Sequence, residues 1–267
     1  MPRIDETMAA LAAKGRKALV AYLCMGDPSH EASIDHAVAC AEAGADVLEL
    51  GVPFSDPTAD GAAIAQASER ALLASGGLAR AIDAARAIRA RTAVPLILFG
   101  YYNPVFVRGE ERTVREAREA GVDGFLVVDL PVDEAGTMRA FCKRAGAALV
   151  PLLTPTSSPA RVEATKAAVR ELAPGFVYYV SLTGVTGSAG REHEWLGAAG
   201  ARAAELRREI GAPVVVGFGI DSPEKARAAA RAGADGVVVG SALVRLVASG
   251  VDPSGLVRAM RKTLDAD

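Results

Sequence analysis

The chain has 267 residues, of which 51% are hydrophobic and 23% are charged, and its formal net charge at pH 7 is −2. This composition is typical of a globular protein with a sizeable core and lies far from that of a disordered chain. Together with a pI of about 6.0, the charge gives no reason to expect nucleic acid or an anionic membrane as a partner.

The cysteine content and the N-terminal stretch predict the cellular setting. The three cysteines, Cys24, Cys40 and Cys142, are odd in number and lack C-x-x-C spacing, so we expect buried free thiols rather than a disulfide framework. Residues 1–20 are charged throughout, without a signal-peptide core, and no later run approaches the roughly 18 apolar residues of a membrane span. The sequence therefore predicts a cytoplasmic protein without a membrane anchor.

One pattern recurs along the chain: a helix that ends in Ala-Gly, a short polar step, and a run rich in β-branched residues. Its glycines, Gly44, Gly121, Gly146 and Gly233, lie where a helix must end, because glycine takes the left-handed conformation without steric cost. Four further apolar runs lack this prefix. In chain order, the eight expected strands lie within residues 17–24, 41–50, 94–100, 118–129, 143–153, 176–181, 212–219 and 231–240.

These strands are apolar at nearly every position, which indicates a parallel sheet covered on both faces. Eight β-α crossovers predict an α/β fold, a single (β/α)₈ TIM barrel in which residues 1–267 form one domain. A doubly wound open sheet is the alternative. Two loops that follow strands are unusually long, one within Leu48–Ile64 and the other at Leu182–Gly197. In a barrel, such loops gather at the carboxyl ends of the strands, where catalysis takes place.

Glycine clusters follow the last three expected strands. Glycine lets backbone N–H groups approach an anion closely, and a helix that begins at Ser241 would add its partial positive charge. Any one cluster is equally well read as a tight turn, but three in this order favour a phosphate site. The residues are Gly184 and Gly187, Gly217 and Gly219, and Gly240 with Ser241.

Glu49 interrupts the apolar run of the second strand. A carboxylate in such surroundings is costly unless it is paired, hydrogen-bonded or protonated. At the open end of a barrel strand, burial would raise the pKa of Glu49 towards the range useful for proton transfer, which makes it the best acid/base candidate. An ion pair with an arginine is the alternative, although no arginine occurs between Arg16 and Arg70.

Two aspartates are candidates for the same rim. Asp60 follows the first long loop, where it either caps the helix that begins near Gly61 or takes part in the site. Asp129 ends the fourth expected strand, and for this residue too a structural and a functional role are equally open.

Other kinds of catalytic site are disfavoured. His30, His36 and His193 show no metal-ligand spacing, so we expect no metal site. The lysines fall before the first strand or within helices, which leaves none for a Schiff base, and there is no G-x-S-x-G elbow. General acid/base catalysis by carboxylates on a phosphate-bearing substrate remains.

The motifs "LELGVPFSDPTADG", "SLTGVTG", "GFGI" and "VVGSA" resemble those of the α subunit family of tryptophan synthase, and the similarity covers nearly the whole chain. The resemblance implies a (β/α)₈ barrel that cleaves indole-3-glycerol phosphate to indole and glyceraldehyde 3-phosphate for tryptophan biosynthesis. It implies no cofactor in this chain. The implied partner is a pyridoxal phosphate-dependent β subunit in an α₂β₂ heterotetramer.

The resemblance also implies roles for individual residues. Glu49 would be the acid/base, and Asp60 would receive the indole N–H. The phosphate would bind at Gly187, Gly219, Gly240 and Ser241. The indole pocket would include Tyr22, Phe99, Tyr101, Leu126, Tyr178, Thr186 and Phe218, although each apolar member alone is equally well explained as core. The β-subunit contact would lie at Pro53, Asp56, Asn103 and Pro104.

Thr58, Ala62 and Leu182 depart from the family's usual residues. Two rival functions remain open: an isomerase or epimerase of a sugar phosphate, and a catalytically silent subunit that binds phosphate ligands and activates a β partner. The aromatic pocket residues favour indole over a sugar. The presence of Glu49 and Asp60 argues against a silent subunit.

Overall fold

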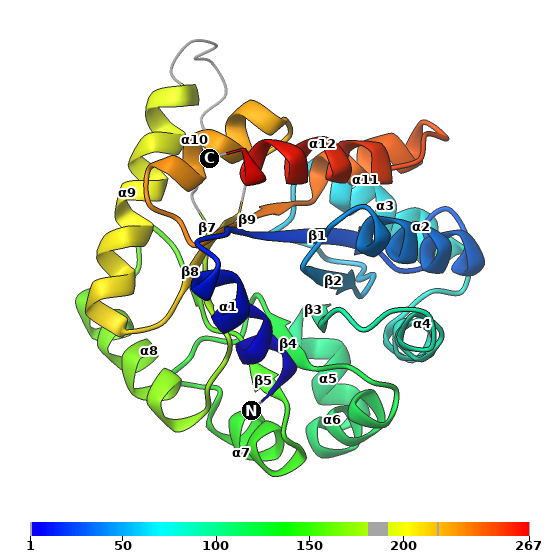
Figure 1. Ribbon diagram of the computed structural model, residues 1–267. Coiled ribbons are helices and arrows are strands. Elements are labelled where there is room, and N and C mark those ends of the chain that lie inside the picture. The colour runs from blue at the N-terminus through cyan, green and yellow to red at the C-terminus, as the bar shows by residue number, and fades with distance from the viewer. Residues whose placement is uncertain (1, 181–191, 218, 267) are drawn as a thin grey trace.

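The computed structural model describes residues 2–180, 192–217 and 219–266. Over these residues the chain forms twelve helices and a nine-stranded parallel sheet, and Figure 1 shows the helices arranged around the strands. No helix in this part of the chain is long and apolar enough to cross a membrane. The strands are β1 Ala18–Cys24, β2 Val47–Gly51, β3 Leu96–Gly100, β4 Gly124–Val127, β5 Ala148–Leu149, β6 Leu152–Leu153, β7 Val177–Val180, β8 Val214–Gly217 and β9 Gly236–Val239.

The helices alternate with the strands as the recurring pattern predicted. The glycines expected to end helices take positive φ angles, +108° at Gly44, +90° at Gly121, +63° at Gly146 and +123° at Gly233. The helices are α1 Arg3–Ala13, α2 His30–Glu42, α3 Ala62–Leu73, α4 Leu78–Arg89, α5 Tyr102–Arg108, α6 Glu110–Glu119, α7 Gly136–Ala145, α8 Pro159–Glu171, α9 Glu192–Ile210, α10 Pro223–Arg231, α11 Ser241–Ala248 and α12 Ser254–Asp265.

The strand order is β5-β4-β3-β2-β1-β9-β8-β7-β6. Neighbours along the chain are neighbours in the sheet, whereas a doubly wound sheet reverses its order at a switch point. The expected α/β class and parallel pairing are therefore confirmed, and the doubly wound alternative is wrong.

The sheet has nine strands rather than the expected eight, because the fifth expected strand is divided into β5 and β6. Pro151 lies at the division, where it has no N–H to donate to a ladder. Val150 N donates to Phe125 O of β4, while Pro151 O accepts from Tyr178 N of β7. The two ends of the sheet order thus belong to one segment, residues 148–153, and the sheet curls far enough for this segment to bond on both sides.

Alternation along each strand explains why the apolar runs are nearly continuous. In β1, Leu19, Ala21 and Leu23 pack in the layer under the helices, while Val20 and Tyr22 pack in the interior enclosed by the sheet. Both faces are covered, so both must be apolar.

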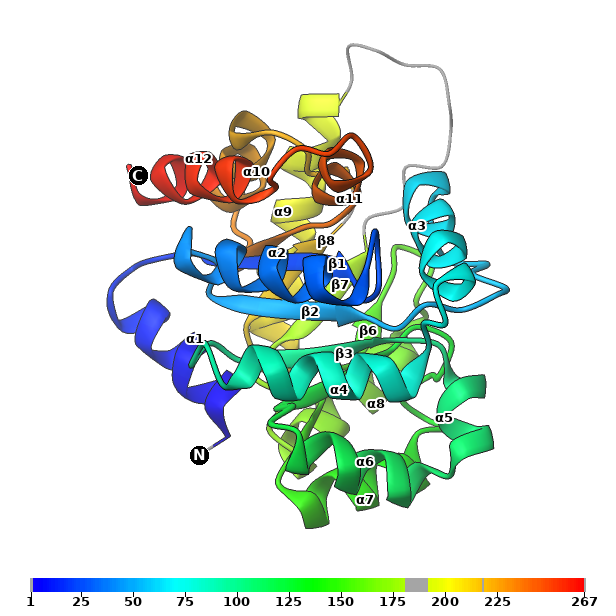
Figure 2. The same ribbon diagram turned by 90° about the vertical axis from the view of Figure 1, so that its right-hand side faces the viewer.

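Helix α1, which the sequence pattern did not predict, packs against the interior at the amino ends of the strands. Ile4, Met8 and Leu11 are buried in the interior cluster. A Cβ at Gly175 would lie 2.1 Å from Ile4 Cγ2, so only glycine allows this approach. Figure 2 shows the strands from the side, with α1 at one end and α3 and α5 towards the other.

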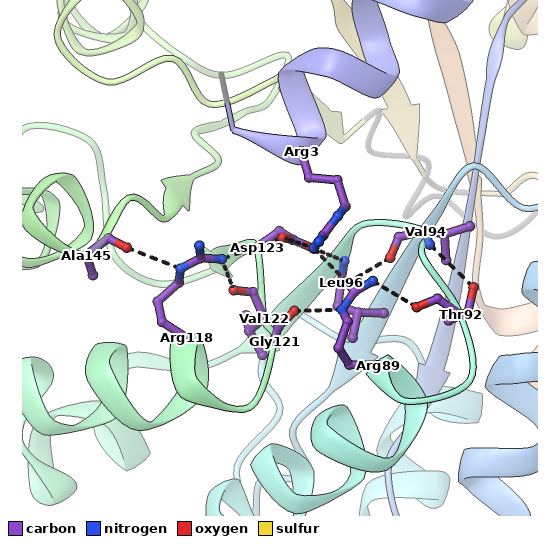
Figure 3. Close-up of polar contacts among 10 residues, drawn as sticks. All are labelled: Arg3, Arg89, Thr92, Val94, Leu96, Arg118, Gly121, Val122, Asp123 and Ala145. Carbon is purple, nitrogen blue, oxygen red and sulfur yellow. Dashed lines mark hydrogen bonds and ion pairs between the residues drawn. The ribbon is translucent and has the colours of Figure 1, made fainter.

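The amino ends of β3 and β4 are held by a network around Asp123 (Figure 3). This buried carboxylate accepts from Leu96 N over 2.9 Å and pairs with Arg3, Arg89 and Arg118 over 2.6, 2.8 and 3.5 Å. Pairing and hydrogen bonding offset the cost of burying the charge. The network joins α1, α4 and α6 at the end of the sheet opposite the site described next.

Candidate active site

A cavity of about 520 Å³ opens at the carboxyl ends of the strands. It brings together residues from both halves of the chain, as expected for loops gathered at one end of a parallel sheet. Its lining comprises Tyr22, Glu49, Thr58, Ala59, Asp60, Gly61, Ile64, Phe99, Val128, Leu152, Thr154, Tyr178, Val180, Gly217, Gly219, Ile220, Asp221, Val238, Gly240, Ser241, Ala242 and Arg245.

Glu49 lies in the middle of β2, where its Cα pairs with Tyr22 of β1 and Ile97 of β3. Its exposed fraction is 0%, and neither carboxyl oxygen has a hydrogen-bond partner in the described part of the chain. Burial alone raises the pKa of Glu49 to about 8. Within the described residues the ion-pair alternative is therefore wrong, and Glu49 is a proton-carrying acid at neutral pH, facing the cavity.

Asp60 is held by Tyr101 at the end of β3. The Tyr101 hydroxyl donates to Asp60 Oδ2 over 3.1 Å and accepts from Ala59 N over 3.0 Å. Burial raises the pKa of Asp60 to about 6, and the hydrogen bond from Tyr101 opposes this rise. The N-cap of α3 is Gly61 without a side-chain cap bond. The capping interpretation of Asp60 is therefore wrong.

Asp129 has a structural contact instead. Its Oδ1 accepts from Tyr102 N over 2.7 Å at the first residue of α5, where a carboxylate satisfies a free helix N–H. It is absent from the described lining of the cavity.

The aromatic wall of the cavity comes from three strands. Tyr22 and Phe99 meet edge to face with centroids 5.2 Å apart, and Phe99 and Tyr178 are 6.4 Å apart. Each tyrosine requires a glycine on the next strand. A Cβ at Gly51 would lie 2.3 Å from Tyr22 Oη, and one at Gly217 would lie 2.2 Å from Tyr178 Oη.

Two residues expected in the indole pocket are not part of this wall. Tyr101 stacks on Phe54 with centroids 5.0 Å apart and reaches the site only through its hydroxyl. Leu126 is fully buried in the interior cluster, whereas Val128, two residues further along the same face, lines the cavity. Alternation along the strand was the signal that could have found Val128.

The expected phosphate residues that the structure describes lie just after the neighbouring strands β8 and β9. Gly240 is the N-cap of α11, Ser241 is its first residue, and Gly219 has a φ of +71°. All three line the cavity, together with Asp221 and Arg245. The other expected positions, Thr186, Gly187 and Phe218, lie outside the described residues.

Several lining residues were missed from the sequence. Thr58 was noted only as a departure from the family, and Thr154 and Arg245 were not singled out. Arg245 had a usable signal, because it follows Ser241 by four residues and therefore shares its face of the helix.

The residues expected to contact a β subunit lie in the loop before α3 and in α5. Pro53 is buried, Pro104 is partly buried, and Asp56 and Asn103 are exposed. Beside them on α5, Phe106 is 65% exposed. A large exposed apolar side chain of this kind is common at protein interfaces.

The cysteines are free and buried, as expected. Among the described residues, no group of three or more His, Cys, Asp or Glu side chains could hold a metal ion.

Comparisons with known proteins identify the family of the chain. Residues 8–263 match the family model described as tryptophan synthase alpha chain. The chain is 48% identical to the tryptophan synthase alpha chain of Geotalea daltonii over 92% of this chain and 90% of that protein. It is 46% identical to the corresponding protein of Xanthomonas euvesicatoria over 100% and 96%. The crystal structure of tryptophan synthase subunit alpha from Legionella pneumophila superposes with a TM-score of 0.88 at 35% identity, covering 100% of both chains. The chain belongs to the tryptophan synthase alpha chain family.

Proposed function

We propose that this chain cleaves indole-3-glycerol phosphate to indole and glyceraldehyde 3-phosphate, with Glu49 as the acid/base and Asp60 as the partner of the indole N–H. Membership of the family supports the lyase reaction. The observation that carries the mechanism is the state of Glu49: it is fully buried without a hydrogen-bond partner among the described residues, and it faces a cavity large enough for the substrate.

The two proton transfers use one carboxyl group. Protonated Glu49 first donates to C3 of the indole ring, which converts the ring into an electron sink with positive charge at its nitrogen. The resulting carboxylate then takes the proton from the hydroxyl on the adjacent side-chain carbon. The bond from C3 to that carbon breaks, its electron pair returns to the ring, and the hydroxyl carbon becomes the aldehyde. Glu49 ends protonated, ready for another turnover.

Asp60 and Glu49 differ in protonation state at neutral pH. Its pKa of about 6 lies below that of Glu49, about 8. At neutral pH, Asp60 is therefore mostly ionised while Glu49 is protonated. An ionised Asp60 accepts the indole N–H and stabilises the positive charge that develops on the nitrogen when C3 is protonated.

The cavity lining suits both parts of the substrate. Tyr22, Phe99 and Tyr178 form an aromatic wall for the indole ring. In the same lining, the N-terminus of α11 presents backbone N–H groups for the phosphate at Ser241 beside Gly240. Gly219 and, outside the described residues, Gly187 would complete the phosphate site, and Thr186 and Phe218 the indole pocket.

The remaining parts of the proposal concern the architecture and the setting. Counting β5 and β6 as one strand gives a closed eight-stranded (β/α)₈ barrel, in which residues 1–267 form a single domain. The chain works in the cytoplasm without a cofactor of its own. Its partner is a β subunit, and we propose that pyridoxal phosphate is bound by that subunit in an α₂β₂ heterotetramer.

The measurement that tests the reaction is release of indole from indole-3-glycerol phosphate by the purified chain, without added metal, in the presence and absence of a tryptophan synthase β subunit. We expect indole in both mixtures and a faster rate with the β subunit, because partner binding orders loops at the site. No indole in either mixture would contradict the proposal and favour a silent subunit or a sugar-phosphate enzyme.

The β-subunit contact is tested by a matched pair of substitutions. Phe106→Ala on α5 should reduce the stimulation by the β subunit without changing the rate of the isolated chain. Leu73→Ala, which truncates another exposed apolar side chain at the end of α3, should leave the stimulation unchanged. Equal stimulation of the two variants would argue against a contact at Asp56, Asn103, Pro104 and the neighbouring Pro53.

A further inference from the structure

The charges that line the cavity are unbalanced. Within the described lining, the carboxyl groups belong to Glu49, Asp60 and Asp221, and the single cationic side chain is that of Arg245. Asp221 forms an ion pair with Lys225 over 3.0 Å, so its charge is matched outside the lining. A phosphate dianion that enters the cavity therefore meets an ionised Asp60 and one guanidinium.

We propose that Arg245 is a substrate-binding residue whose guanidinium supplies the positive charge for the phosphate of indole-3-glycerol phosphate. Arg245 lies on α11 four residues after Ser241, so the two side chains share one face of the helix, one turn apart. Both line the cavity. This inference rests on the phosphate site proposed above and extends it, because the other groups assigned there are neutral.

The guanidinium is available for this role. Arg245 is exposed, and within the described part of the chain its side chain has no hydrogen-bond or ion-pair partner. It also borders a second hollow, shared with Leu246 and Ser249. From its place one turn after Ser241, the long side chain of Arg245 extends to an anion held at the N-terminus of α11. A planar guanidinium binds phosphate oxygens in a bidentate manner.

The position of Arg245 also has a kinetic consequence. Because the cavity is open to solvent and Arg245 is exposed, its charge acts on the substrate before binding is complete as well as after it. Attraction of this kind is weakened by salt. The contribution of Arg245 should therefore be largest at low ionic strength.

The test compares Arg245→Gln and Arg245→Lys with wild type and with Arg208→Gln. Arg208 is exposed on α9 and lies outside the cavity lining, so its substitution makes the same change in net charge. Each chain is assayed with excess β subunit by formation of glyceraldehyde 3-phosphate. Competitive inhibition by inorganic phosphate and by indole is measured on the same proteins. Thermal unfolding checks that each variant is folded.

We expect Arg245→Gln to raise the KM and the inhibition constant of inorganic phosphate by about tenfold to a hundredfold, the value of a charge-assisted hydrogen bond. The kcat and the inhibition constant of indole should stay within about twofold. Arg245→Lys should recover part of the loss, and the salt dependence of KM should be weaker in Arg245→Gln than in wild type.

Three results would overturn the inference in distinguishable ways. If Arg245→Gln matches Arg208→Gln in KM and in phosphate inhibition while Ser241→Ala raises both constants, the phosphate site stands and Arg245 has no part in it. If inorganic phosphate does not compete with the substrate even in wild type, the phosphate site itself is wrong. Equal weakening of phosphate and indole binding in Arg245→Gln would likewise contradict a specific role at the phosphate.

Discussion

The hydroxyl of Tyr101 donates a hydrogen bond to Oδ2 of Asp60 over 3.1 Å. The same hydroxyl accepts from the backbone N–H of Ala59, so the end of β3 fixes the loop that carries Asp60. The pKa of Tyr101 is raised, first by burial and then by the charge of Asp60. Tyr101 therefore remains a donor across the working pH range and stabilises the ionised form of Asp60.

Tyr101→Phe should raise the pKa of Asp60 above its present value of about 6, because the hydrogen bond that lowers it is lost. The protonated fraction of Asp60 at pH 6.5 then grows, so we expect kcat/KM at that pH to fall about tenfold and to recover as the pH rises. Tyr102→Phe is the control, since Tyr102 donates to Glu110 away from the cavity. If kcat/KM of Tyr101→Phe depends on pH below 7 in the same way as that of wild type, this hydrogen bond does not lower the pKa of Asp60.

The rate of cleavage should depend on pH as a bell. Asp60 must lose its proton, which happens above its pKa of about 6, and Glu49 must hold its proton, which requires a pH below its pKa of about 8. A profile of kcat/KM against pH should therefore rise near 6, as Asp60 ionises, and fall near 8, as Glu49 loses its proton. A profile that stays flat through pH 9 would show that protonated Glu49 is not required.

Glu49 should also make the protein less stable as the pH rises. Between the ordinary pKa of 4.5 and the folded-state pKa of about 8, the folded chain keeps a proton that the unfolded chain has lost. The contribution of Glu49 to the free energy of unfolding therefore falls progressively across this window. Glu49→Gln removes the effect, so its free energy of unfolding should exceed that of wild type by on the order of a few kcal/mol at pH 8 and by much less at pH 5.

Urea denaturation at the two pH values measures this difference. Glu209→Gln, at an exposed position on α9, is the matched control and should show no change with pH. A gap between Glu49→Gln and wild type that is equal at pH 5 and pH 8 would show that the pKa of Glu49 is not raised in the folded protein.

Gly51→Ala should disturb the aromatic wall. The new Cβ would lie 2.3 Å from Tyr22 Oη, so the buried ring must move or the strands must separate. We expect the free energy of unfolding to fall by about 1–3 kcal/mol and the KM to rise, as measured by denaturation and steady-state kinetics. Gly136→Ala, where nothing lies within 4 Å of the added Cβ, should change neither. Equal behaviour of the two variants would contradict a close fit at Tyr22.

The arrangement of strands was predictable because it depends on local signals. Glycines that end helices and runs apolar on both faces are visible in the sequence, and together they indicate a parallel sheet. The division of the fifth expected strand could also be seen in the sequence, because Pro151 has no backbone N–H to donate. Which neighbouring strand β5 and β6 each bond to depends on the curl of the whole sheet, which the sequence does not show. Helix α1 escaped prediction because it precedes the first strand and so lies outside the recurring helix-strand pattern, and only the open end of the sheet gives its apolar residues a place to pack.

The site was predictable to a different degree. Glu49 stood out because a carboxyl group in an apolar strand needs an explanation, and its burial supplies one. Asp60 was ambiguous until the structure showed Tyr101 rather than a helix N–H as its partner. Leu126 and Val128 lie two residues apart on the same face of the chain. Which of them reaches the cavity depends on how this strand is aligned with its neighbours, and the sequence does not reveal that alignment. Arg245 was hidden among the many arginines of the helices, since only its position beside Ser241 distinguishes it.

The central claim is that protonated Glu49 transfers the protons in carbon–carbon cleavage. Its most direct test is the turnover of indole-3-glycerol phosphate by Glu49→Gln, together with inhibitor binding, in the presence of the β subunit. The mechanism predicts a kcat lower by about 10² to 10⁴-fold, the usual contribution of general acid/base catalysis, with the inhibition or binding constants of indole and inorganic phosphate unchanged. Turnover by Glu49→Gln at the wild-type rate would contradict the mechanism.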